Sequence, residues 1–256
     1  MENNIKSELW IKKETTMMVT LLRSVPVVIT LSFIISVIVM NLLAQITIVS
    51  LPWLALNAGV FVSWLSFLSM DIITKHFGAK AATKVSIMAM FANLLSAVIC
   101  LIISLIGTIP SLDMFLGGAW SILLASTIAF LLSAVVNNFL NAAIGKRFKK
   151  NPDSKVAYVT RTYISTFVGQ FVDNFAFIAL AFILFPNIPG AAQVHWTVYQ
   201  GLGCAVICAF IELGFEIIFS PLGYRITRKM KKDHIGYEYI DKYCTEEEKA
   251  LNNETI

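Results

Sequence analysis

The sequence predicts an all-α integral membrane protein with six transmembrane helices and with both termini in the cytoplasm. Three observations predict this fold class. The chain has 256 residues, of which 57% are hydrophobic and 14% are charged, whereas a soluble domain carries about 25% charged residues. The apolar residues form six runs that each exceed the ~20 residues an α-helix needs to cross ~30 Å of hydrocarbon. The basic residues lie in alternate connections between these runs, which fixes one orientation.

The six apolar runs divide the chain into a cytoplasmic or interfacial N-terminal segment (1–23), a six-helix transmembrane domain (24–223) and a cytoplasmic tail (224–256). Within the first segment, apolar residues recur at helical spacing over Ile5–Met18, which indicates a helix lying along the membrane surface. The apolar stretch Ile46–Leu56 contains a proline, and we interpret it as an interfacial loop. The predicted spans are residues 24–45, 57–77, 84–109, 117–143, 158–185 and 200–223.

The twenty Lys and Arg residues all lie on one side of this predicted topology. They occupy the N-terminal segment, the connection after the second span, the connection after the fourth span with the start of the fifth, and the tail. The positive-inside rule therefore assigns both termini to the cytoplasm. The basic clusters Lys146–Lys150 and Arg225–Lys232 lie beside predicted spans. Contact with anionic lipid headgroups explains these clusters, so no nucleic-acid partner is predicted.

The sequence carries no signature of an enzyme, a metal site or a cofactor site. It lacks a Gly-rich phosphate loop, a Cys/His metal spacing, a Gly-x-Ser-x-Gly nucleophile motif and any ATPase signature. A lipid-modifying membrane enzyme stays an alternative, because paired acids inside spans could support such chemistry. The cysteines predict small residues that pack in apolar surroundings rather than a disulfide framework. They are Cys100, Cys204, Cys208 and Cys244.

Ionisable side chains inside the predicted spans are the candidate functional groups, because each costs about 2.5–3.5 kcal/mol to insert at bilayer depth. Asp173 lies near the middle of the fifth span, with Gln170 and Asn174 beside it and Thr166 two turns earlier. These carboxylate and amide groups predict a solute site that binds donor and acceptor groups of a ligand. The alternative is a structural knot with the fourth-span amides Asn137, Asn138 and Asn141.

The second span ends in a polar group. Asp71 and Thr74 lie one helical turn apart, and Gly78 marks the expected end of the helix. A coupling or structural role for these residues competes with a simpler interpretation, in which Lys75 forms a local ion pair with Asp71. Arg161, at the start of the fifth span, pairs with an acid or phosphate in one interpretation and extends to the lipid headgroups in the other.

The sixth span carries two acids on one face, Glu212 and Glu216, one turn apart. Such a pair could hold a cationic substrate or carry a proton. Glu216 is nearer the cytoplasmic end, so its side chain could instead reach the interface. In the outer connection before this span, Trp196 beside His195 is expected to be a belt aromatic at the membrane surface.

Several motifs occur in order along residues 24–232. The stretch Phe67–Ala81 contains the pattern Asp-x-x-Thr-x-x-aromatic-Gly, and the fifth span reads Ser165-Thr166-x-x-x-Gln170-x-x-Asp173-x-x-x-Phe177. Further elements are Asn41, Ala125-Ser126 with Ala129-Phe130, Arg161, Ala181-Phe182 and Pro221-Leu-Gly-Tyr224. Together these motifs resemble those of the queuosine-precursor transporter family, also called VUT, the vitamin uptake transporters.

This resemblance implies a six-helix importer of deazaguanine bases, such as the cyano and aminomethyl precursors of queuosine, or of queuine, in the cytoplasmic membrane of a prokaryotic cell. It implies that Asp173, Gln170 and Asn137 face the base. The chain departs from the family at Ala134 and Asn137, where members often carry Gln and Asp, and near Glu212, where many carry Lys. The transporter class follows from the resemblance, but the exact substrate does not. Supporting or coupling roles are expected of Asp71, Glu212 and Arg161.

We therefore predict a secondary carrier or facilitator for a nucleobase-like solute, embedded in the lipid bilayer and without a cofactor. Small residues four apart, such as Ala125 and Ala129, permit close helix contact and are compatible with a homodimer. The alternative is a substrate-binding subunit of an energy-coupling-factor importer for a vitamin or purine-like solute. Such a subunit would need separate ATPase and scaffold subunits as energising partners.

Overall fold

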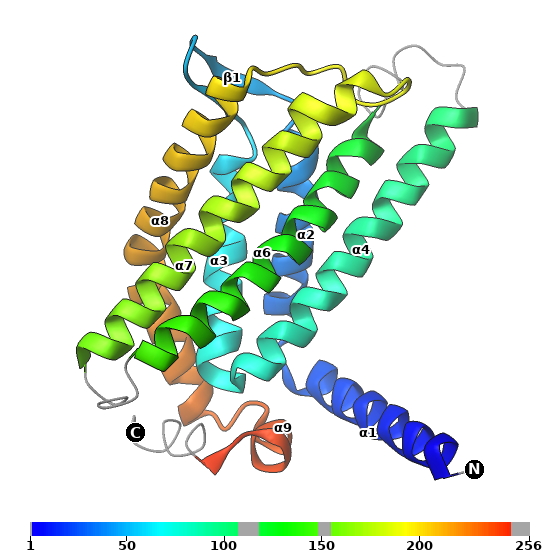
Figure 1. The fold of residues 1–256 in the computed structure, drawn as a ribbon. Coiled ribbons are helices and arrows are strands. Elements are labelled where there is room, and N and C mark those ends of the chain that lie inside the picture. Colours follow the sequence, from blue (N-terminus) through cyan, green and yellow to red (C-terminus); the bar gives the residue numbers. More distant parts are fainter. Residues whose placement is uncertain (1, 107–117, 148–154, 247–256) are drawn as a thin grey trace. The chain divides into compact units, whose positions relative to one another are not determined.

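The computed structural model of the chain describes residues 2–106, 118–147 and 155–246, and these residues are mostly helical (Figure 1). A helix lies at each of the six predicted apolar runs, and further helices lie before the first and after the last of them. The elements are α1 (Glu2–Ser24), α2 (Val27–Leu43), β1 (Thr47–Ser50), β2 (Ala55–Asn57), α3 (Val60–Phe77), α4 (Ala79–Ile106), α6 (Ala119–Arg147), α7 (Lys155–Ile178), the π-helix η1 (Ala179–Leu184), the 3₁₀ helix η2 (Phe185–Asn187), α8 (Val198–Lys232) and α9 (Tyr237–Tyr243).

Three helical stretches of the described residues are long and apolar enough to cross a membrane: Ala79–Ile103, Phe167–Asn187 and Val198–Lys232. A fourth is added if the bent pair Lys12–Ser24 and Val27–Leu43 forms one span, although its two helices meet at 102°. Pro26 separates that pair, since proline cannot continue a helix but readily begins one. The stretch Ala119–Ser133 is apolar but shorter. The chain is therefore a helical membrane protein, and its six-span topology stays a prediction.

The described chain divides into two compact units. The first unit contains Met1–Ser36, Leu65–Ala89 and Glu216–Ile256, and the second contains Val37–Trp64 and Met90–Phe215.

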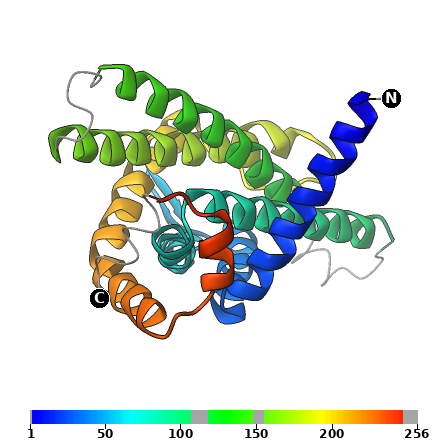
Figure 2. The ribbon, with the colours of Figure 1, turned by 90° about the horizontal axis from the view of Figure 1, so that it is seen from below.

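In the first unit, the tail folds back on the end of α3. Gly78 follows α3 with a φ of 84°, as expected of a glycine that ends a helix. The ring Nε2 of His76 lies 2.8 Å from the carbonyl oxygen of Ile235, and the Cys244 thiol donates to the carbonyl of Phe77. Helix α9 packs against α1 (Figure 2) and buries Tyr239. The polar tail thus contains an ordered helix.

In the second unit, α6 and α7 run side by side (Figure 1). Small residues permit this close packing, because helices in lipid associate through close contact rather than through the hydrophobic effect. Phe182 of η1 packs on Trp196 with ring centroids 4.3 Å apart, and Trp196 is only 8% exposed. The prediction of a surface belt aromatic at Trp196 is therefore wrong, whereas His195 beside it is exposed. Cys204 and Cys208 lie in the same core, which confirms their predicted packing role.

The stretch that we interpreted as an interfacial loop instead forms a β-hairpin in the second unit. Strands β1 and β2 pair antiparallel, and Leu51 and Leu54 close the turn through backbone hydrogen bonds. The Gln200 amide donates to the carbonyl of Leu51 over 2.8 Å. A Cβ at Gly203 would lie 2.1 Å from the carbonyl oxygen of Trp53, so only glycine allows α8 to approach the hairpin this closely. Apolar and polar residues alternate at the start of this stretch, over Ile46–Ile48, and such alternation is typical of a strand. The prediction of a loop did not take this pattern into account.

Two buried asparagines join three helices of the second unit. The Asn41 amide of α2 donates to Asn93 Oδ1 of α4 over 3.1 Å and to Ser126 Oγ of α6 over 2.9 Å. The Asn93 amide donates to the carbonyl of Leu123 over 2.8 Å and to Thr127 Oγ1 over 3.1 Å. We call these residues the asparagine clasp. Sequence reasoning singled out Asn41 through the family resemblance but missed Asn93.

Replacing Asn93 by Ala should lower the free energy of unfolding by about 1–3 kcal/mol, because several buried hydrogen bonds are lost at once. The measurement is denaturant or thermal unfolding of the purified protein in detergent. The matched control is Ser96→Ala on the same helix, since Ser96 bonds only to the carbonyl of Ala92 within α4 among the described contacts. Equal, small effects of the two substitutions would show that the clasp does not hold the helices together.

Candidate solute-binding site

Helices α7 and α8 bring together two of the predicted polar groups in the second unit. The Asn174 amide of α7 donates to Glu212 Oε2 of α8 over 2.9 Å. Glu212 is only 9% exposed, so its carboxyl group is removed from solvent and depends on the protein for its partners. Asn174 is a neutral donor. It satisfies part of the hydrogen-bonding capacity of Glu212 without compensating its charge.

Asp173, beside Asn174 on α7, contributes a second carboxyl group to this site. Its Oδ1 is buried without a hydrogen-bond partner among the described residues. Ser133 of α6 lies within hydrogen-bonding reach of this carboxyl. The Ser133 hydroxyl also lies 3.0 Å from the carbonyl of Phe130 on its own helix, and a hydroxyl has only one proton to donate. The Asp173 carboxyl is therefore poorly supplied with donors.

Gln170 adds a third acceptor to the same stretch of helix. It precedes Asp173 by three residues, so the two side chains lie on one face of α7. Its Oε1 is also buried without a hydrogen-bond partner among the described residues. Buried polar atoms are almost always hydrogen-bonded in native proteins. Two buried acceptors on one face of α7 therefore lack a donor within the described part of the chain.

Glu212 lies within electrostatic reach of both Asp173 and Cys208. Cys208 is in turn 3.5 Å from Cys204, one turn earlier on α8, measured between the sulfur atoms. Among the described residues, no group of three or more His, Cys, Asp and Glu side chains could hold a metal ion. The site consists of two carboxyl groups with amides and a hydroxyl, contributed by α6, α7 and α8, and we call it the acid-pair site.

The structure tests only part of the predicted solute site. It joins Glu212 of the predicted sixth span to Asn174 of the fifth, two residues that the sequence analysis assigns to one substrate-binding set without a specific contact between them. It also adds Ser133 and Cys208, which sequence reasoning missed because single serines and cysteines are common in apolar helices. The side chains of the other predicted residues lie outside the described part of the structure; they are Thr166, Asn137, Asn138, Asn141, Arg161 and Glu216.

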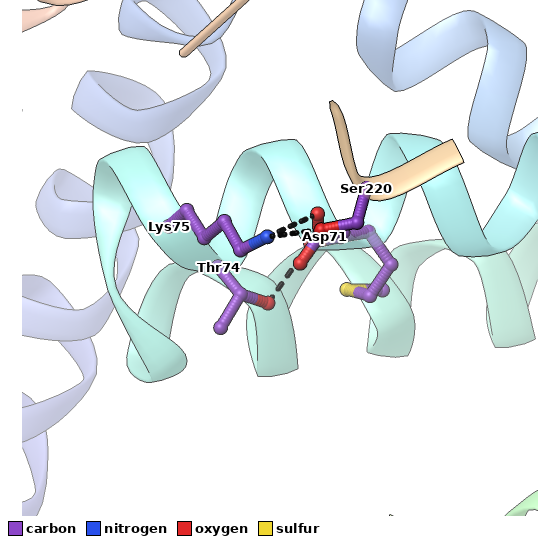
Figure 3. Close-up of polar contacts among 5 residues, drawn as sticks. Asp71, Thr74, Lys75 and Ser220 are labelled. Carbon is purple, nitrogen blue, oxygen red and sulfur yellow. Dashed lines mark hydrogen bonds and ion pairs between the residues drawn. The ribbon is translucent and has the colours of Figure 1, made fainter. Parts of the chain in front are cut away.

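Asp71 and Lys75 form an ion pair in the first unit, with Lys75 Nζ 2.7 Å from Asp71 Oδ2 (Figure 3). Lys75 Nζ also lies 3.5 Å from Ser220 Oγ of α8. Thr74 Oγ1 donates to the carbonyl of Met70 on its own helix over 2.9 Å. The local ion pair considered in the sequence analysis is therefore present. Thr74 does not contribute its hydroxyl to that pair, and a coupling role for either residue stays a prediction.

Helices able to span a membrane, with buried carboxyl and amide groups on α7 and α8, define a polytopic helical membrane protein. Residues 57–226 match a protein-family model described as "Putative vitamin uptake transporter". The match covers most of the chain, including the acid-pair site and the Asp71–Lys75 ion pair. The chain belongs to this family of transporters. No curated protein matches the chain, and no solved structure does.

Replacing Lys75 by Gln should change the free energy of unfolding by less than about 1 kcal/mol, because solvated ion pairs contribute little. The side chains of Lys75 and Asp71 are 42% and 22% exposed. The measurement is thermal or denaturant unfolding. Gly223→Ala is the comparison, since its Cβ would lie 3.0 Å from Asp71 Oδ2 and disturb the same contact sterically. A loss of several kcal/mol for Lys75→Gln would contradict this estimate.

Proposed function

We propose that the chain is a secondary carrier or facilitator that imports a queuosine precursor, a deazaguanine base or queuine, into the cytoplasm. The observation that carries this proposal is a pair of buried acceptors on α7, Gln170 Oε1 and Asp173 Oδ1, which have no hydrogen-bond partner within the described residues. A deazaguanine base presents adjacent N–H donors from its ring and its exocyclic amino group. Such an edge matches two acceptors that lie three residues apart on one helix face. Membership of a transporter family supports the same function.

The proposed topology has six spans, with both termini in the cytoplasm and the protein in the cytoplasmic membrane of the cell. The six spans correspond to α2, α3, α4, α6, α7 with η1, and α8. The distribution of Lys and Arg supports this orientation, since three of the five connections contain neither residue. Helix α1 would then lie along the cytoplasmic membrane surface, because it meets α2 at 102°. In this arrangement the lipid bilayer is the partner, and the protein is not an enzyme.

The description of the family favours a second candidate function, the binding of a vitamin. In that function the chain would be the substrate-binding subunit of an energy-coupling-factor importer, and it would need ATPase and scaffold subunits for transport. Uptake by the purified chain alone in liposomes separates the two functions, because the subunit would bind its solute without accumulating it.

Thermal stabilisation by a panel of deazaguanines, purines and vitamins tests the proposed substrate class. A ligand that binds the folded state stabilises it by mass action and so raises its melting temperature. At a ligand concentration 100 times the Kd, the free energy of unfolding increases by about 2.7 kcal/mol. We expect a deazaguanine to stabilise the protein and Asp173→Asn to abolish most of that shift. The matched control is Asp241→Asn, because Asp241 is exposed on α9 of the first unit.

Stabilisation by a vitamin or an ordinary purine, with no response to any deazaguanine, would exclude queuosine precursors as the solute, and uptake in liposomes would then decide between a carrier and an importer subunit. A deazaguanine shift that Asp173→Asn leaves unchanged would keep the substrate and exclude the acid-pair site as its binding site.

A further inference from the structure

We propose that Asp173 and Glu212 act as one electrostatic pair that takes up a single positive charge with each imported solute. The charge is carried either by an ammonium group on the solute or by a proton that accompanies a neutral solute. This inference rests on the proposed function as a carrier. The inference states which charge the acid-pair site requires, and neither the family nor the fold specifies that charge.

Glu212 is buried, and the described residues compensate its charge incompletely. Its described hydrogen bond comes from the neutral amide of Asn174 over 2.9 Å, and it is 9% exposed. An ionised carboxyl group in such surroundings loses its hydration and gains no opposite charge from the described residues. A neutral amide donor offsets only part of that loss.

Asp173 increases the negative charge of the site. It directly precedes Asn174, whose amide bonds to Glu212 over 2.9 Å, it lies within electrostatic reach of Glu212, and its Oδ1 is buried without a partner among the described residues. Two carboxyl groups that interact in a buried site do not both ionise readily, because each charge disfavours the other. The pair therefore holds its two negative charges together only when a positive charge is added.

The described groups that face the pair come from three helices. Ser133 faces it from α6, Gln170 and Asn174 lie beside Asp173 on α7, and Cys208 lies beside Glu212 on α8. Neither carboxyl has a Lys, Arg or His partner among the described residues. The ion pairs Asp71–Lys75 and Glu14–Lys84 both belong to the first unit. The described surroundings thus supply hydroxyl, amide and thiol groups but no cation.

The two sources of charge have different consequences for transport. A cationic solute carries one positive charge inward by itself, whereas a neutral solute carries it with a proton. Both cycles are driven by a membrane potential that is negative inside, and accumulation rises about tenfold for each ~60 mV. Only the cycle with the neutral solute is also driven by an inward proton gradient.

The first experiment measures the charge requirement without any ligand. At pH 8, Glu212→Gln should raise the melting temperature of the purified protein by about 2–4 °C, because glutamine removes the cost of a second buried carboxyl, which must either ionise beside Asp173 or hold a proton at a pH where the unfolded chain does not. The matched control Glu238→Gln, on the exposed face of α9, should leave the melting temperature unchanged. A lowered melting temperature for Glu212→Gln would overturn the proposal, because it would show that the Glu212 charge is already compensated.

The second experiment identifies the source of the charge. Proteoliposomes containing the full chain take up the neutral 7-cyano or the cationic 7-aminomethyl deazaguanine under a valinomycin potential or an imposed pH gradient. We expect the potential to stimulate uptake of both bases and the pH gradient to stimulate uptake of the cyano base alone. Glu212→Gln should lose the stimulation by the pH gradient, and Glu238→Gln should retain it.

Uptake of the cyano base that responds to neither gradient in the wild-type protein would overturn the proposal. Absence of uptake for both bases would instead contradict the proposed function. In that case the melting temperature of Glu212→Gln still decides whether the acid pair demands a positive charge, so the two failures are distinguishable.

Discussion

The hydrogen bonds of the asparagine clasp are the constraint on which the arrangement of the second unit depends. Apolar helices surrounded by lipid gain little from hiding apolar surface from one another, so specific polar contacts and close packing must decide their neighbours. Asn93 connects α4 to Asn41 of α2 and to the backbone and side chains of α6. Helix α6 in turn packs along α7 and presents Ser133 to Asp173. The position of the acid-pair site is therefore set in part by amides that do not belong to it.

Much of the fold could be predicted from the sequence, because a long apolar run has few alternatives to a helix where backbone groups cannot bond to water. The apolar runs predicted the helices, and Gly78 predicted the boundary between α3 and α4, where the structure shows a positive φ. The hairpin was harder to predict, since a short apolar stretch such as residues 46–56 suits a loop, a strand or an extension of the preceding helix. The burial of Trp196 was predicted wrongly for a related reason. A tryptophan between a proline-containing loop and an apolar helix can lie either at the membrane surface or in the protein core, and the neighbouring residues do not distinguish the two.

The candidate site was only partly predictable. The spacing of Gln170, Asp173 and Asn174 placed three polar groups on one stretch of α7, because helical periodicity is a local property. The contact between Asn174 and Glu212 could not be predicted, since it depends on which helices are neighbours, and no periodicity in a single sequence specifies that. Sequence reasoning assigned Glu212 to the same substrate-binding set as Asn174 and also noted Glu216 on its own helix, but it specified no contact. The ion pair of Asp71 and Lys75 was predictable because its two members lie four residues apart in the same helix.

The π-helix η1 sets the rotational phase of α7. A π-turn holds one more residue than an α-turn. Compared with a regular α-helix of the same residues, the segment Ala179–Leu184 therefore changes the rotation of α7 relative to Phe182, whose ring packs on Trp196. Each residue of an α-helix advances the chain by about 100° around the axis. If the same residues were wound as regular α-helix, the face that carries Asp173 and Gln170 would turn by about a quarter of a revolution, whereas deletion of one residue within the segment would leave that face in place. The π-turn thus absorbs the extra residue and keeps the polar face of α7 aimed.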